Sequence, residues 1–177
     1  MAEISRVALF GKLNSLGYKA IESATVFCKL RGNPYVEMTH WLHQILQLPD
    51  SDVHRVIQHF NLNPARLAKD FTEALDRLPR GATSISDLSS HVDAAVREAW
   101  VYATLMFKDA QVRTGHLLVG MLKTPDLRNA LLAISREFDK IKLDDLTERF
   151  ADIVAASPES GLRATDGSQV GGGAAPG

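Results

Sequence analysis

Reactive and charged features are scarce in this sequence. Cys28 is the single cysteine in 177 residues, so no disulfide can form within the chain, and a lone thiol suits a reducing compartment. The 20 Lys and Arg residues nearly balance the 21 Asp and Glu residues, and there is no basic run of the kind that binds nucleic acid. No hydrophobic run reaches the roughly 20 residues that cross a membrane, and the N-terminus has no signal-peptide pattern. We therefore expect a cytoplasmic protein whose partners include no nucleic acid and no membrane.

What the sequence does contain is a duplication. Residues 36–46 read VEMTHWLHQIL, and residues 112–122 read VRTGHLLVGML. Moving one segment by 76 positions places His40 on His116 and Leu46 on Leu122. The apolar residues of both segments recur at steps of three and four, which predicts a helix with one buried face.

The flanking sequence carries the same duplication. Ala20 aligns with Ala95 at a shift of 75, and LAKDF aligns with LTERF at a shift of 79. Loops absorb such changes of shift between repeats. The sequence therefore predicts an all-α fold of two four-helix repeats, each of roughly 75 residues. The first repeat is expected at about residues 14–79 and the second at about residues 86–156.

Two segments fall outside the duplication. Residues 2–12 predict an extra N-terminal helix that is apolar on nearly all sides, so it must be buried, cover another element or receive a partner. Residues 157–177 contain six of the twelve glycines and only two bulky aliphatic side chains. Such a segment buries too little apolar surface to offset its conformational entropy. We expect a flexible linker there, leading to a further region of a longer protein.

Three patterns suggest chemistry at first sight. Gly115 and Gly120 have the spacing of a phosphate loop, but the lysine comes two places late and the segment is helical, so no nucleotide site is predicted. His40 and His116 occupy the same repeat position. This favours a structural role, with one ring nitrogen bonded to backbone or to a neighbouring side chain, over a metal site that Cys28 could not complete. Cys28 itself aligns with an alanine, as expected of a small core residue. We expect no catalytic residue, no metal and no cofactor in this chain.

The repeat resembles a known family. The A-x-x-A helix, the V-x-x-x-H-x-L-x-x-x-L helix and the D-[VL] helix start resemble the double Clp N-terminal domain of Hsp100-type AAA+ unfoldases. The first repeat, with FCKLRGNPYVE and SDVHRVIQHF, is similar to the ClpV branch of these unfoldases, which recycles the contractile sheath of type VI secretion systems. The resemblance covers about residues 1–157.

This resemblance also implies a function. The domain would be a substrate receptor without ATPase activity of its own. Its partner would be an α-helical segment near the N-terminus of the large sheath subunit, which the full-length hexamer would disassemble. ATP and Mg²⁺ would belong to the full-length protein, and the isolated domain would be monomeric. The extra helix at residues 2–12 matches the additional helix with which ClpV forms its peptide groove.

The apolar candidates for that groove lie on the extra helix, at the start of the next helix, and where the chain enters the second repeat. They are Leu9, Phe10, Leu13, Leu16, Tyr18, Ile21, Ile85 and Leu88. An incoming amphipathic helix would place anchors there at i, i+3 or i+4, and i+7. Two other hypotheses stay open on the residues alone. One is a structural or adaptor-binding helical module of another Clp/Hsp100 unfoldase, and the other is an enzyme or metal protein that uses the histidines.

Overall fold

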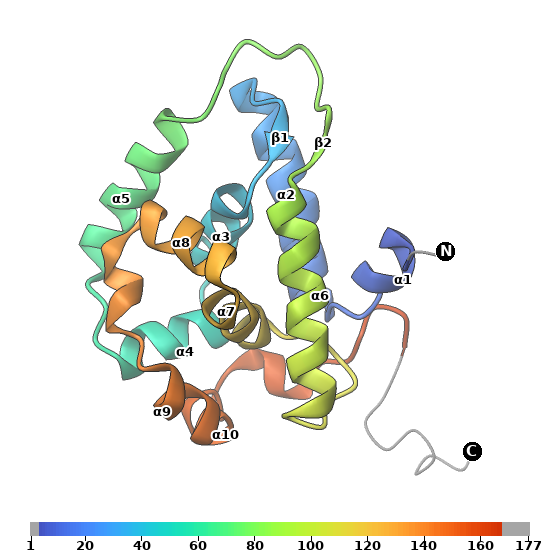
Figure 1. Cartoon of the computed structure of the whole chain (residues 1–177), viewed down its shortest axis with the longest axis vertical. Coiled ribbons are helices and arrows are strands. Elements are labelled where there is room, and N and C mark those ends of the chain that lie inside the picture. The colour runs from blue at the N-terminus through green and yellow to red at the C-terminus, as the bar shows by residue number, and fades with distance from the viewer. Residues whose placement is uncertain (1–3, 168–177) are drawn as a thin grey trace.

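The computed structural model describes residues 4–167, and this part of the chain is mostly helical (Figure 1). The first repeat follows α1 (Arg6–Phe10) and consists of α2 (Ser15–Arg31), α3 (Met38–Leu46), α4 (Asp52–His59) and α5 (Pro64–Asp76). The second repeat consists of α6 (Ser90–Leu105), α7 (Thr114–Lys123), α8 (Pro125–Ile134), the 3-10 helix η1 (Arg136–Lys140), α9 (Leu143–Glu148) and α10 (Phe150–Ile153). A second 3-10 helix, η2 (Pro158–Gly161), follows. The predicted all-α fold of two repeats is confirmed.

The two duplicated helices, α3 and α7, lie at the centre of the molecule. Trp41 and Ile45 of α3 are fully buried, and every residue of α7 up to Leu122 is buried. Helix α7 packs against α6, α8, α4 and α9, as its central position in Figure 1 indicates. The buried side chains of both repeats belong to one continuous hydrophobic cluster. The repeats therefore share a single core.

Side chains cap several helix starts. Asn14 caps α2 by accepting a hydrogen bond from the amide of Gly17 at 2.9 Å, and Ser89 caps α6. Arg149 separates α9 from α10. The extra N-terminal helix is shorter than residues 2–12, because Ser5 caps it at one end and the chain leaves the helix after Phe10. Residues 1–3 lie outside the described part.

Short strand pairings interlock the two repeats. Strand β1 (Tyr35–Val36) in the first repeat pairs in parallel with β2 (Asp87–Leu88) at the start of the second. Leu13, at the start of the first repeat, forms a parallel bridge with Val112 in the middle of the second. By the duplication, Leu13 corresponds to Leu88 and Val112 to Val36, so the second pairing repeats the first with the roles exchanged. Each repeat therefore begins on a partner strand from the other.

Gly115 and Gly120, which have the spacing of a phosphate loop, lie where α7 packs closely against its neighbours. A Cβ on Gly120 would lie 2.8 Å from the backbone nitrogen of Ala99 in α6, and a Cβ on Gly115 would lie 2.7 Å from the ring of Phe150. Neither position has room for a side chain. The glycines let α7 approach its neighbours closely.

The predicted linker begins too early. Residues 157–167 are described and pack against the domain, with Ser157, Glu159 and Ala164 all buried. The prediction counted apolar side chains, whereas this segment is held by one buried carboxylate and by backbone hydrogen bonds. Residues 168–177, the rest of the predicted linker, lie outside the described residues.

That carboxylate belongs to Glu159, which joins the starts of three helices. It accepts hydrogen bonds from the Asn14 side chain of α2 at 2.9 Å, from the Asp52 amide of α4 at 2.7 Å, and from the amide and hydroxyl of Thr114 of α7, the amide at 2.8 Å. Helix N-termini carry unpaired amides and favour a negative charge. Burial and the neighbouring Asp52 carboxylate raise the pKa of Glu159, while its hydrogen bonds from Thr114 and Asn14 oppose that rise.

Candidate functional site

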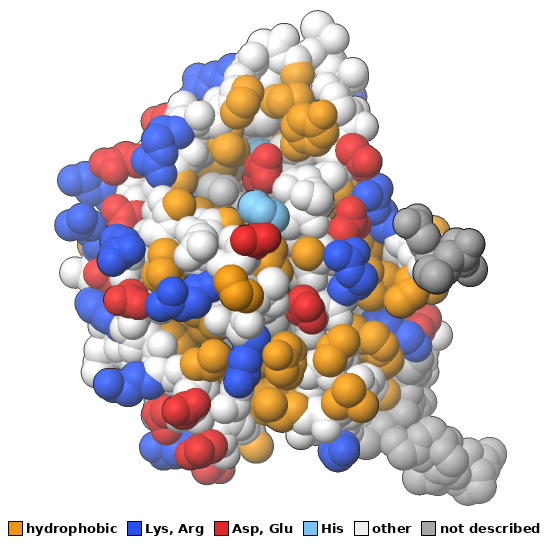
Figure 2. Space-filling model, viewed as in Figure 1, with side chains coloured by type: hydrophobic (Ala, Val, Ile, Leu, Met, Phe, Trp, Pro, Cys, Tyr) orange, Lys and Arg blue, Asp and Glu red, His pale blue; other side chains and the backbone are white. Residues whose placement is uncertain are grey.

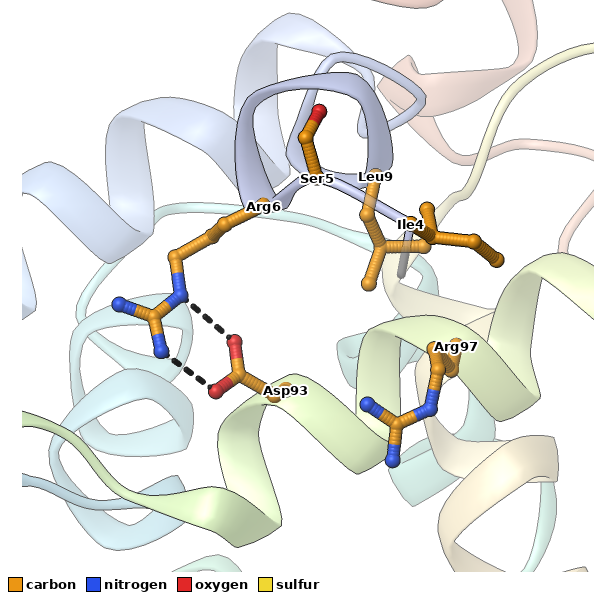
Figure 3. Close-up of a pocket in the computed structure, with 6 residues that line it drawn as sticks. All are labelled: Ile4, Ser5, Arg6, Leu9, Asp93 and Arg97. Atoms are coloured by element: carbon orange, nitrogen blue, oxygen red, sulfur yellow. Dashed lines mark hydrogen bonds and ion pairs between the residues drawn. The ribbon is translucent and has the colours of Figure 1, made fainter. Parts of the chain in front are cut away.

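Helix α1 is fixed to the second repeat through Arg6. Its guanidinium donates to Asp93 of α6 at 2.9 and 2.7 Å and to Asp87 of β2 at 2.7 Å. Figure 3 shows Arg6 reaching from α1 down to Asp93. These ion pairs raise the pKa of Arg6 and hold the pKa of Asp87 below its usual range. One side of α1 is thereby tied to α6, and the other side is left facing α2.

A shallow apolar groove of about 270 Å³ lies on that other side. We call it the α1–α2 groove. It is lined by Arg6, Val7 and Phe10 of α1, Tyr18, Ile21, Glu22 and Thr25 of α2, and Leu88 of β2. Half of the predicted site residues therefore come together here, namely Phe10, Tyr18, Ile21 and Leu88.

The other four predicted residues lie elsewhere. Leu13 is fully buried beneath the groove as part of the core. Leu9 is buried on the opposite side of α1, where it lines an open polar hollow of about 750 Å³ with Arg97 (Figure 3). Leu16 is half-buried in the first turn of α2, and Ile85 packs against the core from the loop before β2.

Sequence reasoning missed four residues of the groove, which are Arg6, Val7, Glu22 and Thr25. A sequence signal existed for two of them. Tyr18, Glu22 and Thr25 follow one another at steps of four and three, so they lie along one face of α2. The prediction named only apolar and aromatic side chains, which excluded Arg6, Glu22 and Thr25. Val7 is apolar and was missed although it meets that criterion.

A second apolar hollow, of about 410 Å³, lies between α3, α4 and α5. Its lining includes Leu46, Ile57, Phe71 and two histidines, His43 and His54. Burial and the nearby Arg31 lower the pKa of His43, so this ring favours its neutral form. No predicted residue belongs to this hollow.

His40 and His116 have the structural role that the duplication predicts. Nδ1 of His40 accepts the amide hydrogen of Glu37 at 2.9 Å, and Nδ1 of His116 accepts that of Arg113 at 3.0 Å. Each ring thus caps the start of its own helix. The other nitrogen of His40 bonds to the Asn33 side chain at 2.9 Å. Burial lowers the pKa of His40 to about 4 and that of His116 to about 3, so both rings are neutral near pH 7.

An exposed apolar patch lies on α6. Figure 2 shows hydrophobic side chains gathered over the C-terminal end of α6, where Val101, Leu105 and Met106 are exposed. Between residues 4 and 167, no helix is long and apolar enough to cross a membrane. Nor do three or more His, Cys, Asp or Glu residues of this part gather in an arrangement that could hold a metal ion.

Comparison with known proteins explains the duplication. The family model described as the Clp repeat (R) N-terminal domain matches residues 17–134, which reach from the start of α2 to the end of α8. The chain belongs to this Clp N-terminal domain family. It is 68% identical, over all of its 177 residues, to the AAA+ ATPase ClpV1 of Pseudomonas aeruginosa, and it spans 19% of that protein's length.

Solved structures of Clp N-terminal domains have the same fold. One is described under "Coevolution of the ATPase ClpV, the TssB-TssC Sheath and the Accessory HsiE Protein Distinguishes Two Type VI Secretion Classes". It is 70% identical with a TM-score of 0.87, covering 90% of this chain and 98% of that one. A second is a complex of a ClpV N-domain with a VipB peptide. It is 25% identical with a TM-score of 0.78, covering 90% of this chain and 97% of that one.

Proposed function

We propose that this chain is the substrate-receptor domain of a ClpV-like AAA+ ATPase and that its α1–α2 groove binds an α-helix near the N-terminus of the large type VI sheath subunit. The groove would present the sheath subunit to a cytoplasmic, full-length hexamer, which disassembles and recycles the sheath with ATP and Mg²⁺. The domain contributes binding and no catalysis. Its own Gly115 and Gly120 support this, because both are used for helix packing.

One observation carries this proposal: helix α1 has no counterpart in the second repeat, and an open groove lies beside it. Residues 77–86, before the second repeat, contain no helix equivalent to α1. Within residues 4–167, the second repeat therefore has no equivalent of the wall that α1 gives to the α1–α2 groove. The same fold in a ClpV N-domain binds a VipB peptide.

The groove has the chemistry that an amphipathic helix requires. Val7 is 86% exposed beside the buried ring of Phe10, so an apolar surface is available without any rearrangement of the core. Each apolar anchor that a partner helix buries there contributes about 1.5–3 kcal/mol. Glu22 lies among the lining residues and offers a negative charge to a polar flank of the partner, whereas the guanidinium of Arg6 is already paired with Asp87 and Asp93.

A titration with two matched variants tests the proposal. A labelled peptide from the N-terminal segment of the large sheath subunit is titrated into the full chain and into Val7→Asp and Leu105→Asp. Val7 lines the groove, whereas Leu105 is 69% exposed on α6 and does not line it. Both substitutions replace an exposed aliphatic side chain, so neither should disturb the core.

We expect Val7→Asp to weaken peptide binding about tenfold or more, because the partner would bury an unpaired carboxylate. Leu105→Asp should bind as the unchanged chain does. Equal affinities for the two variants would place the peptide elsewhere. No binding to the unchanged chain would favour an adaptor-binding or structural module of another Clp-type unfoldase.

A further inference from the structure

Helix α1 forms one wall of the groove, and the segment that follows it is bonded to residues that come much later in the sequence. Residues 11–14 join α1 to α2, and they lie between two other segments of the chain. On one side, the Val112 amide donates to the carbonyl of Lys12 at 2.7 Å, and the Asn14 amide donates to the carbonyl of Val112 at 3.0 Å. On the other side lie residues 157–167, which we call the C-terminal strap.

The strap bonds to two backbone carbonyls of the same short segment. The Thr165 amide and hydroxyl both donate to the carbonyl of Leu13 at 2.7 Å, and the Asp166 amide donates to the carbonyl of Gly11 at 2.8 Å. The backbone carbonyls of Gly11 and Leu13 thus face the strap, while the carbonyl of Lys12 and the amide of Asn14 face Val112. This alternation is the pattern of a central strand with a neighbour on each side.

Side chains strengthen this contact. The ammonium group of Lys12 lies 2.9 Å from the carboxylate of Asp166. The strap also passes very close to Gly11, where an added Cβ would lie 3.3 Å from the Cβ of Asp166. Farther back, buried Glu159 fixes the strap to the starts of α2, α4 and α7.

Helix α1 depends on this anchoring because it is short. It has five residues, far fewer than the about 12–15 at which an isolated helix begins to be stable in water. Its position is therefore set by its attachments, which are the buried side chains of Leu9 and Phe10, the ion pairs of Arg6 at the start, and residues 11–14 at the end. The ion pairs lead to α6 and β2, and residues 11–14 lead to Val112 and to the strap.

We propose that the C-terminal strap positions α1 and so holds the α1–α2 groove in its binding shape, with Thr165 and Asp166 as positioning residues. This inference rests on the proposed function of the groove. The strap touches residues 11–14 and does not line the groove itself. Loss of its contacts would therefore act on the partner through the mobility of α1.

The test compares three variants of the full chain. Thr165→Val with Asp166→Ala removes the hydroxyl and the carboxylate of the strap. Thr165→Ser keeps a hydroxyl at the same place. Thr83→Val with Asp152→Ala makes the same chemical changes at two exposed positions outside the strap.

The first measurement is amide hydrogen exchange, which needs no peptide. The amides of Leu9, Gly11 and Leu13 report on α1, and the amide of Leu117 in α7 reports on the core. In the strap double variant, we expect exchange in α1 to be about tenfold faster, from the loss of a hydrogen bond and a partly exposed ion pair. Exchange at Leu117 should not change, and Thr165→Ser and the outside variant should match the unchanged chain.

The second measurement is the affinity for the sheath peptide, which should fall about tenfold in the strap double variant and stay unchanged in the others. Unchanged exchange in α1, or equally faster exchange at Leu117, would overturn the positioning role. Faster exchange in α1 with full affinity would overturn its link to the groove. If the unchanged chain fails to bind the peptide, the proposed function fails, while the exchange result still decides whether the strap positions α1.

Discussion

Arg113 and Asp52 form an ion pair with two hydrogen bonds of 2.8 Å, and this pair joins the second repeat to the first. Arg113 precedes α7 and Asp52 begins α4. The Asp52 side chain is fully buried and that of Arg113 is 11% exposed. Two charges that have left water in this way depend on each other, because removing one leaves the other buried without an opposite charge.

We expect Arg113→Ala to lower the free energy of unfolding by about 3–5 kcal/mol. Arg128→Ala is the matched control, since Arg128 pairs with Asp139 at the surface and should contribute about 0–1 kcal/mol. Urea denaturation monitored by circular dichroism measures both. Similar losses for the two variants would show that the buried ion pair contributes no more to the free energy of unfolding than the surface ion pair.

The buried histidines predict how stability depends on pH. The pKa of His40 is lowered to about 4 and that of His116 to about 3, chiefly by burial, against about 6.5 in an unfolded chain. Below pH 6.5 the unfolded state therefore binds protons that the folded state does not. Their contribution to stability is fully present above pH 6.5 and is lost progressively as the pH falls from 6.5 to about 4 for His40 and to about 3 for His116.

Urea unfolding at pH 7.5, 5.5 and 4.5 should show this loss. The double variant His40→Gln, His116→Phe should be less sensitive over the same range, because neither side chain takes up a proton. If the double variant showed the same pH dependence as the unchanged chain, the loss of stability at low pH would not come from His40 and His116.

Replacement of the histidine cap should affect stability and not binding. We expect His40→Ala to cost about 1–3 kcal/mol, because the Glu37 amide and the Asn33 side chain lose their partner. Thermal unfolding measures the loss, and titration of the sheath peptide should give an unchanged affinity. Lost binding by a variant that is still folded would assign His40 to the partner site.

The close approach of α7 to α6 predicts an unusual cost for a small substitution. Gly120→Ala should destabilise the domain by about 1–3 kcal/mol, although alanine favours helices, because its Cβ would meet the backbone of Ala99 at 2.8 Å. Gly161→Ala is the control, since a Cβ there meets nothing within 4 Å. A thermal unfolding midpoint of Gly120→Ala equal to that of the control would mean that α6 can move away at little cost.

The helices were predictable because their signal is local and repeated. Apolar spacing marked the buried faces of α3 and α7. The interlocked pairings were not predictable, since strands of two residues leave no alternation in the sequence. Glu159 was missed for a related reason. Its partners are amides from three distant helix starts, and no spacing in the sequence records them.

The candidate groove was predictable in part. The asymmetry of α1 directed attention to α1 and α2, and Phe10 and Tyr18 of these helices line the groove between them. Leu13 is apolar in the same way, but its backbone is paired on both sides and its side chain is buried. A sequence alone does not distinguish an apolar residue that receives a partner from one that a neighbouring segment already covers.

The contact between the strap and residues 11–14 has a consequence for how this protein is made. Helix α1 leaves the ribosome before the strap, and the residues that bond to the segment after it, Thr165 and Asp166, are synthesised more than 150 positions later. At about 5–20 residues per second, the delay is roughly 8–30 s. Over that interval the helices made between α1 and the strap can fold around α7, whereas residues 11–14 gain their bonds to the strap only after Thr165 and Asp166 have been made.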